Sequence, residues 1–421
     1  MHSVRTIILG AGVSGLATAA ALGDDDYLVL EADTSIGGYC KTVKKDGFVW
    51  DYSGHFFHFK HKEIETWLRE RMPGQRVRVV EKKSFVAYGD RRIDFPFQKN
   101  IHQLPQAEFI DCIHDLYFAD LARRTSPPAE TSFREMLYAR FGRSIAEKFL
   151  IPYNEKLYAC DLGTLDKDAM GRFFPHADLT DIVRNMKTPD NASYNSSFTY
   201  PEGGAIEYVN AIASAVRPGA IALSEPVVSI DVDKKIAKTP RREIAFERLV
   251  SSVPFNRLAQ MCVVEHDASV FTWNKVLVFN LGFDKKGPEA IHWLYHPSRE
   301  TSFYRIGFYD NIFDTDRMSL YVELGYPKDA PVDIDAMRVR VLADLAREKI
   351  VTNQRLVADH SVVMDPAYVH ITRASMKEHA RVASLLREQG VHSIGRYGGW
   401  TYCSIEDNIV EARALCVTLR A

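Results

Sequence analysis

A glycine-rich segment near the start of the chain has the spacing that binds a dinucleotide. Gly10, Gly12 and Gly15 form a GxGxxG motif, and Val13 and Ser14 lie between its last two glycines. Gly10 would permit a tight turn, Gly12 would let the backbone approach a pyrophosphate, and Gly15 would let a helix pack closely against a strand. The N–H groups and positive dipole at the start of that helix would then hold the anion.

An acidic residue and a second glycine pair follow where a flavin dinucleotide would need them. Glu31 lies about 20 residues after the motif, where a carboxylate can accept hydrogen bonds from ribose hydroxyls. Gly37, Gly38 and Tyr39 come next, and this pair resembles the extended signature of the glutathione-reductase-like flavoproteins. We therefore predict that FAD, rather than NAD, occupies the site. The chain has no second GxGxxG motif, so a reductant such as NADPH would bind only transiently at the flavin.

The residues around these motifs predict a β–α–β unit followed by helices and then by strands. Thr6–Leu9 and Tyr27–Glu31 are short apolar runs, and Ser14–Leu22 between them is alanine-rich. Helical periodicity dominates residues 109–150. Two amphipathic surface helices are expected near the C-terminus, at 338–349 and 376–389. Strand-like alternation with many aromatic residues is found at 220–232, 244–253, 275–283, 303–309 and 318–324.

This order of elements predicts an α/β fold with three parts. The first is a Rossmann-like FAD-binding domain, and the others are a helical insertion and a mixed or antiparallel substrate sheet. We expect residues 1–90, 205–255 and 390–421 to form the FAD-binding domain, 91–204 the insertion and 256–389 the substrate sheet.

Composition and charge exclude several classes of protein. The chain has 421 residues, a net charge of −2 and well-mixed acidic and basic residues, so nucleic acid is not an expected partner. Its six cysteines are scattered, which indicates neither a metal site nor a disulfide framework and fits a cytoplasmic protein. No uninterrupted apolar stretch is long enough for a membrane helix. A homo-oligomer remains possible.

Further motifs are scattered over nearly the whole chain. They are Asp51–His58, Phe95–Gln98, Pro152–Ala159, Ser302–Ile306 and Gly395–Ile409. These segments resemble the UDP-galactopyranose mutase family, a branch of the flavin amine-oxidase-like fold.

The resemblance implies additional flavin contacts. Gly54 and His55 match a Gly-His pair beside the isoalloxazine, where a histidine can hydrogen-bond the reduced ring and tune its charge. The closing segment, rich in glycine and followed by a helix, would return the chain to the flavin. Further cofactor contacts are expected at Val227, Gly395, Arg396, Glu406, Asp407 and Ile409.

The resemblance also implies a substrate site. Arg172 and Arg305 would clamp a diphosphate because the planar guanidinium donates two parallel hydrogen bonds. Tyr402 would reach the substrate phosphate, and these three residues with His55 are the expected catalytic set. If Ser302–Ile306 is an alternating strand, Phe303 shares a face with Arg305, and Tyr304 points away. Tyr153, Asn154, Tyr158 and Tyr368 are further candidates for substrate binding.

The reaction that the resemblance implies is a redox-neutral ring contraction of a nucleotide-linked hexopyranose to the hexofuranose. Reduced flavin N5 would attack the anomeric carbon and displace the nucleoside diphosphate. The sugar would reclose through a different hydroxyl, and the diphosphate would recapture the anomeric carbon and release the flavin. The protein would mainly position the sugar and hold the leaving group.

Other interpretations stay open. A flavin-dependent amine oxidase or desaturase is the main alternative, because the same fold hosts that chemistry. A non-catalytic flavin-binding scaffold in a sugar-assembly complex is another. Arg172 could instead form a surface ion pair, and Tyr368 could belong to the core. The aromatic residue that stacks on the nucleotide base is unassigned, and Trp273, Tyr194 and Trp293 are available for it.

Overall fold

The glycine motif follows the carboxyl end of the first strand of a seven-stranded sheet. The structure is a computed structural model that describes residues 2–23, 25–127, 130–191 and 196–420. In this seven-stranded sheet β12, β1, β2 and β9 run parallel in that order, and β18 pairs in parallel with β12. Strand β11 pairs antiparallel with β12, and β10 pairs antiparallel with β11, so these two strands extend the sheet on the side away from β9. The strands are β1 (His2–Leu9), β2 (Tyr27–Leu30), β9 (Ile221–Ala222), β10 (Ser229–Asp231), β11 (Ile236–Lys238), β12 (Glu243–Ser251) and β18 (Val391–Ser393).

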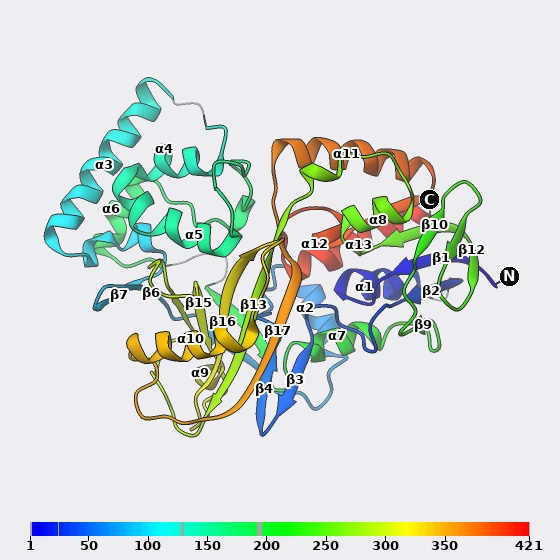
Figure 1. The fold of residues 1–421 in the computed structure, drawn as a ribbon, viewed down its shortest axis with the longest axis horizontal. Helices are drawn as coiled ribbons and strands as arrows, with labels where there is room; N and C mark the ends of the chain where they lie inside the picture. The colour runs from blue at the N-terminus through cyan, green and yellow to red at the C-terminus, as the bar shows by residue number, and fades with distance from the viewer. Residues whose placement is uncertain (1, 24, 128–129, 192–195, 421) are drawn as a thin grey trace.

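Helices from both ends of the sequence cover this sheet (Figure 1). The alanine-rich helix α1 is buried along most of its length, because α7 and α13 both pack against it. Small side chains permit this close approach. Helix α13 is the last element of the chain, so the C-terminal segment returns to the first domain, as predicted. The helices around the sheet are α1 (Val13–Leu22), α2 (Lys62–Arg69), α7 (Ile206–Ala213), α8 (Phe255–Met261), α11 (Arg373–Glu388), α12 (Gly395–Gly398) and α13 (Ile405–Arg420).

A second seven-stranded sheet has the order β17-β13-β16-β15-β14-β6-β7 and is antiparallel except where β14 pairs with β6. Helix α10 (Ile334–Arg347) packs on one face through Val341 and Leu345, and α9 (Tyr309–Phe313) follows β15. Two small two-stranded antiparallel sheets pair β3 (Thr42–Lys45) with β4 (Phe48–Asp51), and β5 (Val77–Glu81) with the distant β8 (Ser197–Pro201). The strands of the large sheet are β6 (Ser84–Tyr88), β7 (Arg91–Asp94), β13 (Trp273–Phe283), β14 (Trp293–Tyr295), β15 (Arg305–Phe308), β16 (Ser319–Pro327) and β17 (Leu356–Val369).

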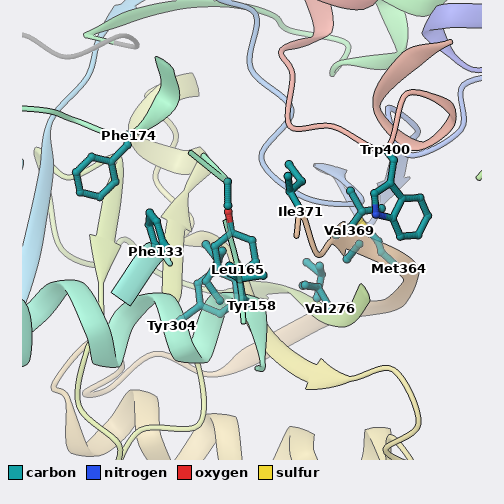
Figure 2. Close-up of a cluster of buried hydrophobic side chains, with 14 of the residues drawn as sticks. Phe133, Tyr158, Leu165, Phe174, Val276, Tyr304, Met364, Val369, Ile371 and Trp400 are labelled. Atoms are coloured by element: carbon teal, nitrogen blue, oxygen red, sulfur yellow. The ribbon is translucent and has the colours of Figure 1, made fainter. Parts of the chain in front are cut away.

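A group of helices extends from the second sheet on the side away from the nucleotide sheet (Figure 1). It contains α3 (Gln106–Thr125), α4 (Phe133–Ile145), a π-helical turn at Ala146–Leu150, α5 (Ile151–Tyr158) and α6 (Leu179–Lys187). Figure 2 shows the buried core that joins this group to the rest of the molecule. Phe133 and Tyr158 of the helices lie in the same cluster as Val276 of β13, Val369 of β17 and Trp400 of the closing segment.

The structure confirms the predicted fold class of a Rossmann-like sheet, a helical insertion and a mixed sheet. The predicted domain boundaries remain a proposal, and the strand pairing shows that residues 84–94 belong to the second sheet. Helices α10 and α11 begin a few residues before the positions predicted for them. Among the described residues, no helix combines the length and apolar character that a bilayer crossing requires.

Candidate active site

A cavity of about 830 Å³ lies where the glycine motif, the second glycine pair and the closing segment meet. Most residues predicted to contact the cofactor line it, although they come from distant parts of the sequence. The predicted residues in its wall are Gly10, Gly12, Val13, Ser14, Glu31, Gly37, Gly38, Tyr39, His55, Val227 and Arg396.

The glycine motif has the backbone geometry that its spacing predicts. Gly10 has a φ of +93°, and a Cβ on Gly15 would lie 1.9 Å from the Gly10 carbonyl oxygen. A Cβ on Gly12 would meet nothing closer than Gly38 Cα at 3.9 Å, so the two glycine loops lie next to each other in the wall of the cavity. Glu31 accepts hydrogen bonds from the N–H of Ala11 at 2.6 Å, which fixes its carboxylate beside the motif.

His55 is one of the residues that line this cavity. Its Nδ1 is buried and has no hydrogen-bond partner among the described residues. Burial, and then the positive charge of Arg396, lower the pKa of His55 to about 4, so the imidazole is neutral near pH 7. A buried polar atom without a partner is costly unless a ligand satisfies it. Gly54 lies beside it and packs against Tyr321, outside the cavity wall.

Arg396 is a partly buried cation beside two tyrosines. Its guanidinium lies 5.1 Å from the ring centre of Tyr368 and 4.5 Å from that of Tyr402, and these two rings are stacked. Burial alone would lower the pKa of Arg396, but the phenol groups of Tyr397, Tyr402 and Tyr368 outweigh it and the guanidinium stays charged. No carboxylate within the part of the chain that the structure describes forms an ion pair with it. The site therefore favours an anionic ligand.

Arg305 is also partly buried, with its side chain 19% exposed, but its charge is shared with Glu323. Its Nε lies 2.5 Å from Oε2 of Glu323 and its Nη2 lies 2.9 Å from Oε1, and this carboxylate is 1% exposed. Ser53, two residues before His55, donates a hydrogen bond to the same carboxylate. The bidentate contact leaves Nη1 of Arg305 able to donate to a ligand.

The prediction that Phe303 shares a face with Arg305 was wrong. Strand β15 begins only at Arg305, so the alternation does not extend back to residues 303 and 304. Phe303 packs in the core on the α10 side of the sheet, whereas Arg305 lies 5.9 Å from the ring centre of Tyr304. Tyr304, rather than Phe303, is the aromatic neighbour of Arg305 in the site.

Helix α5 brings two of the predicted substrate residues to the same region. Tyr153 packs edge-on against Tyr304, with ring centres 6.1 Å apart, and Tyr158 packs edge-on against Tyr368 at 5.9 Å. The hydroxyl of Tyr158 and Oδ1 of Asn154 are buried without hydrogen-bond partners among the residues described. These atoms could serve a ligand, while the aromatic rings shape its pocket.

Arg172 occupies the edge of this region. Its side chain is 45% exposed and forms an ion pair with Asp407 at 2.5 Å, as the alternative interpretation allowed. Its neighbour Phe173 packs edge-on against Tyr402 at 5.0 Å, so the arginine is close to the tyrosine pair. Arg172 could reach a substrate only by exchanging its carboxylate partner.

Several predicted cofactor residues lie next to the cavity but do not line it. Glu406 is buried and accepts hydrogen bonds from the N–H groups of Lys60 and His61 near the start of α2. Asp407 forms a capping hydrogen bond with the N–H of Ser404 at the start of α13. Gly395 approaches Ser14, and Ile409 packs in the core between α13 and α1.

Sequence reasoning missed three polar residues of the site. Asn408 lines the cavity and accepts hydrogen bonds from Ser14 Oγ at 2.9 Å and from Arg396 N–H at 3.1 Å. It lies inside the closing motif, directly after Glu406 and Asp407, and nothing in its local sequence sets it apart from these neighbours. Arg257 of α8 also lines the cavity, and Glu323 holds Arg305. No local pattern marks these last two.

The aromatic residues available for base stacking lie in different surroundings. Trp273 donates a hydrogen bond to Asp365 at 2.7 Å and lies 5.4 Å from the ammonium of Lys328. Trp293 is buried and donates to the hydroxyl of Tyr321. Tyr194 lies outside the described residues.

A Rossmann-like sheet with a cavity at its glycine motif and an adjoining mixed sheet defines a dinucleotide-binding fold. The pattern of the flavin containing amine oxidoreductase family matches residues 13–367, so the chain belongs to that family. Protoporphyrinogen oxidase 2 of Arabidopsis thaliana is 25% identical over 197 residues, which is 43% of this chain. The match spans 37% of that relative's length.

Two solved structures superpose on nearly the whole chain. A reduced UDP-galactopyranose mutase superposes with a TM-score of 0.91 over 99% of this chain and 96% of that one, at 23% identity. Cyclohexylamine oxidase from Brevibacterium oxydans IH-35A superposes with a TM-score of 0.69 over 99% of this chain and 100% of that one, at 16% identity. At these identities the superpositions establish the fold.

Proposed function

We propose that the chain is an FAD-dependent mutase that converts a nucleotide-linked hexopyranose to the hexofuranose. The observation that carries this proposal is the pair of partly buried guanidinium groups, Arg305 and Arg396, among tyrosines beside the cavity. Such a wall suits a diphosphate better than an amine. The resemblance in fold to a UDP-galactopyranose mutase supports the same choice of substrate class.

The residues of the cavity fit FAD. The N–H groups at the start of α1 and the open face of Gly12 suit the pyrophosphate, and Glu31 suits the ribose. His55 lines the cavity and is neutral, so its ring suits a place beside the isoalloxazine. When bound and reduced, FAD supplies an electron-rich nitrogen that can act as a nucleophile at a sugar carbon.

The protein's own groups would then hold the leaving group and exclude water. Nη1 of Arg305 can donate to one phosphoryl group, and the hydroxyls of Tyr158, Tyr368 and Tyr402 can reach others. Arg172 would join them by leaving Asp407 when the more highly charged diphosphate arrives. Fixing the diphosphate while the sugar turns would lower the barrier mainly through positioning.

The alternative is a flavin-dependent amine oxidase or desaturase. The aromatic walls formed by Tyr153, Tyr295 and Tyr304 favour it, because aromatic rings also receive cationic or apolar substrates. The uncompensated charge of Arg396 argues against a cationic amine at this place. We propose an external reductant such as NADPH for the flavin under the mutase interpretation.

Ligand binding to the FAD-loaded protein tests the proposal. We expect UDP to bind in the micromolar range, and Arg305→Ala to weaken it by about 30-fold or more, because a hydrogen bond between charged groups contributes about 2 kcal/mol. Arg355→Ala, an exposed arginine on the far part of the sheet, is the matched control and should bind normally. Binding of a primary amine in preference to UDP would favour the oxidase instead.

A further inference from the structure

Lys156 reaches from helix α5 to the segment 296–304, which connects β14 to β15. Its ammonium donates to oxygen atoms near the start of this connection and to others near its end. These acceptors are the carbonyl oxygens of His296 at 3.0 Å, Ser298 at 2.8 Å and Phe303, and the hydroxyl of Thr301 at 3.0 Å. One cation on the helical insertion therefore fixes both ends of the connection that leads into Arg305.

The same turn of α5 holds the residues that flank the connection. Tyr153 lies three residues before Lys156 and therefore on the same face of the helix. Its ring packs edge-on against the rings of Tyr295 and Tyr304, with centres 5.4 Å and 6.1 Å away. Tyr295 ends β14, and Tyr304 directly precedes Arg305. One face of α5 thus contacts the connection through a charged group and, at its two ends, through an aromatic ring.

The backbone of Lys156 also contacts the strand that carries Glu323. A Cβ on Gly325 of β16 would lie 2.1 Å from the Lys156 carbonyl oxygen, so this glycine lets α5 lie directly on the strand. Glu323, two residues earlier in β16, holds Arg305 by two hydrogen bonds. Lys156 therefore contacts, through its side chain and its backbone, the segments that carry the two members of this ion pair.

An apolar side chain of the same length would fill this space without the cost of taking a charge out of water. The ammonium is partly buried, and its acceptors lie in the segment whose path decides where Arg305 points. We propose that Lys156 is a positioning residue of the substrate site, which holds the β14–β15 connection so that Arg305 meets its ligand in one orientation. This inference rests on the proposed function in one respect, because it takes the ligand of Arg305 to be a diphosphate.

The groups that face the ammonium set the pH range in which it is charged. Burial lowers the pKa of Lys156 to about 7. The carboxylates of Asp344 in α10 and of Glu348 just after it act in the opposite direction, and the cation of Arg299 lowers this pKa further. His296 is neutral, because burial and then the charge of Lys156 lower its pKa to about 3. As pH rises above about 7, the connection therefore loses its charged donor.

UDP binding to the FAD-loaded protein and hydrogen exchange of its amides test this role. Lys156→Met keeps the length of the side chain and removes its charge, and Lys187→Met, an exposed lysine on α6 of the same insertion, is the matched control. At a pH of about 6, Lys156→Met should weaken UDP binding about tenfold, because a mobile arginine must be ordered when the ligand binds. FAD affinity should not change. Amides of 296–304 should exchange about tenfold faster, while those of β1 keep their rates.

Two measurements separate positioning from a general structural role. If Lys156 acts through Arg305, Lys156→Met should change UDP affinity less than about twofold in an Arg305→Ala background. The difference in UDP affinity between wild type and Lys156→Met should also shrink to about threefold or less as pH rises to about 9, because the wild-type amine is then neutral too. In the wild type alone, amides of 296–304 should lose protection relative to β1 over the same pH range, a measurement that needs no variant to fold.

UDP affinity that Lys156→Met leaves unchanged, additive losses in the Arg305→Ala background, or exchange in 296–304 that responds to neither the substitution nor pH would overturn the proposal. A wild-type chain that binds no UDP would instead refute the proposed function. The exchange measurements would then decide alone whether Lys156 fixes the connection.

Discussion

Replacing Glu323 by glutamine would remove the charge from a buried ion pair while keeping its shape. The two hydrogen bonds to Arg305 are 2.5 Å and 2.9 Å long, and the charge centres are about 4 Å apart, which gives about 4 kcal/mol at an effective dielectric constant of about 20. Removing one partner of a buried pair costs about 3–5 kcal/mol. Glutamine keeps one acceptor, so we expect the free energy of unfolding to fall by about 3 kcal/mol.

Urea unfolding of the flavin-loaded protein measures this loss, and a double-mutant cycle with Arg305→Met assigns it to the pair. The double variant buries neither charge, so its destabilisation should be smaller than the sum of the two single losses by about 2 kcal/mol. Glu289→Gln removes an exposed carboxylate and is the control. A Glu323→Gln loss below about 1 kcal/mol, or strict additivity in the cycle, would refute the reasoning.

Three further outcomes are expected. Gly12→Ala should leave the stability of the flavin-free chain within about 0.5 kcal/mol of wild type, because the atom nearest to the added methyl is Gly38 Cα at 3.9 Å. The same substitution should lower FAD affinity at least about tenfold, which a fluorescence titration would measure. Burial raises the pKa of Asp51 to about 7, so the folded chain keeps a proton that the unfolded chain releases. Stability should therefore fall as pH rises from about 4 to about 7, and Asp51→Asn should flatten that dependence in urea midpoints. Arg172→Ala should change the unfolding free energy by less than about 1 kcal/mol, since its ion pair is exposed, but should reduce turnover; equal turnover would exclude it from the substrate site.

The dinucleotide half of the site could be predicted because its signals are local. Gly10, Gly12 and Gly15 specify a turn between one strand and the helix that follows it, and Glu31 ends the next strand in the same unit. Short-range connections of this kind leave few alternative geometries. The residues therefore meet in one cavity regardless of how the rest of the chain is arranged.

The substrate half depends on contacts that local sequence does not encode. Arg305 meets Glu323 because β15 pairs with β16 in the register that places the two residues opposite each other. The strands could be predicted, but a register shift of one residue would have moved Glu323 to the other face. The face predicted for Phe303 was wrong for a related reason. Where a strand begins depends on its pairing with neighbouring strands, which local sequence does not specify.

The two carboxylates of the closing motif show a second limit of predicting a site from sequence. Glu406 and Asp407 were predicted as cofactor contacts because they lie beside flavin-binding glycines in the sequence. The structure places Glu406 at backbone N–H groups near α2 and Asp407 at the start of its own helix. Helix starts attract acidic side chains whether or not a ligand is near, so residue type alone could not separate the two roles.

Turnover by the reduced enzyme decides between a mutase and an oxidase. Purified protein is reduced anaerobically with dithionite and incubated with a panel of UDP-linked hexopyranoses, and the furanose products are separated by chromatography. The account predicts conversion of at least one sugar by the reduced protein, none by the oxidised protein, and loss of conversion in Arg305→Ala. Inert reduced protein, or hydrogen peroxide formed in step with oxidation of an amine, would contradict it.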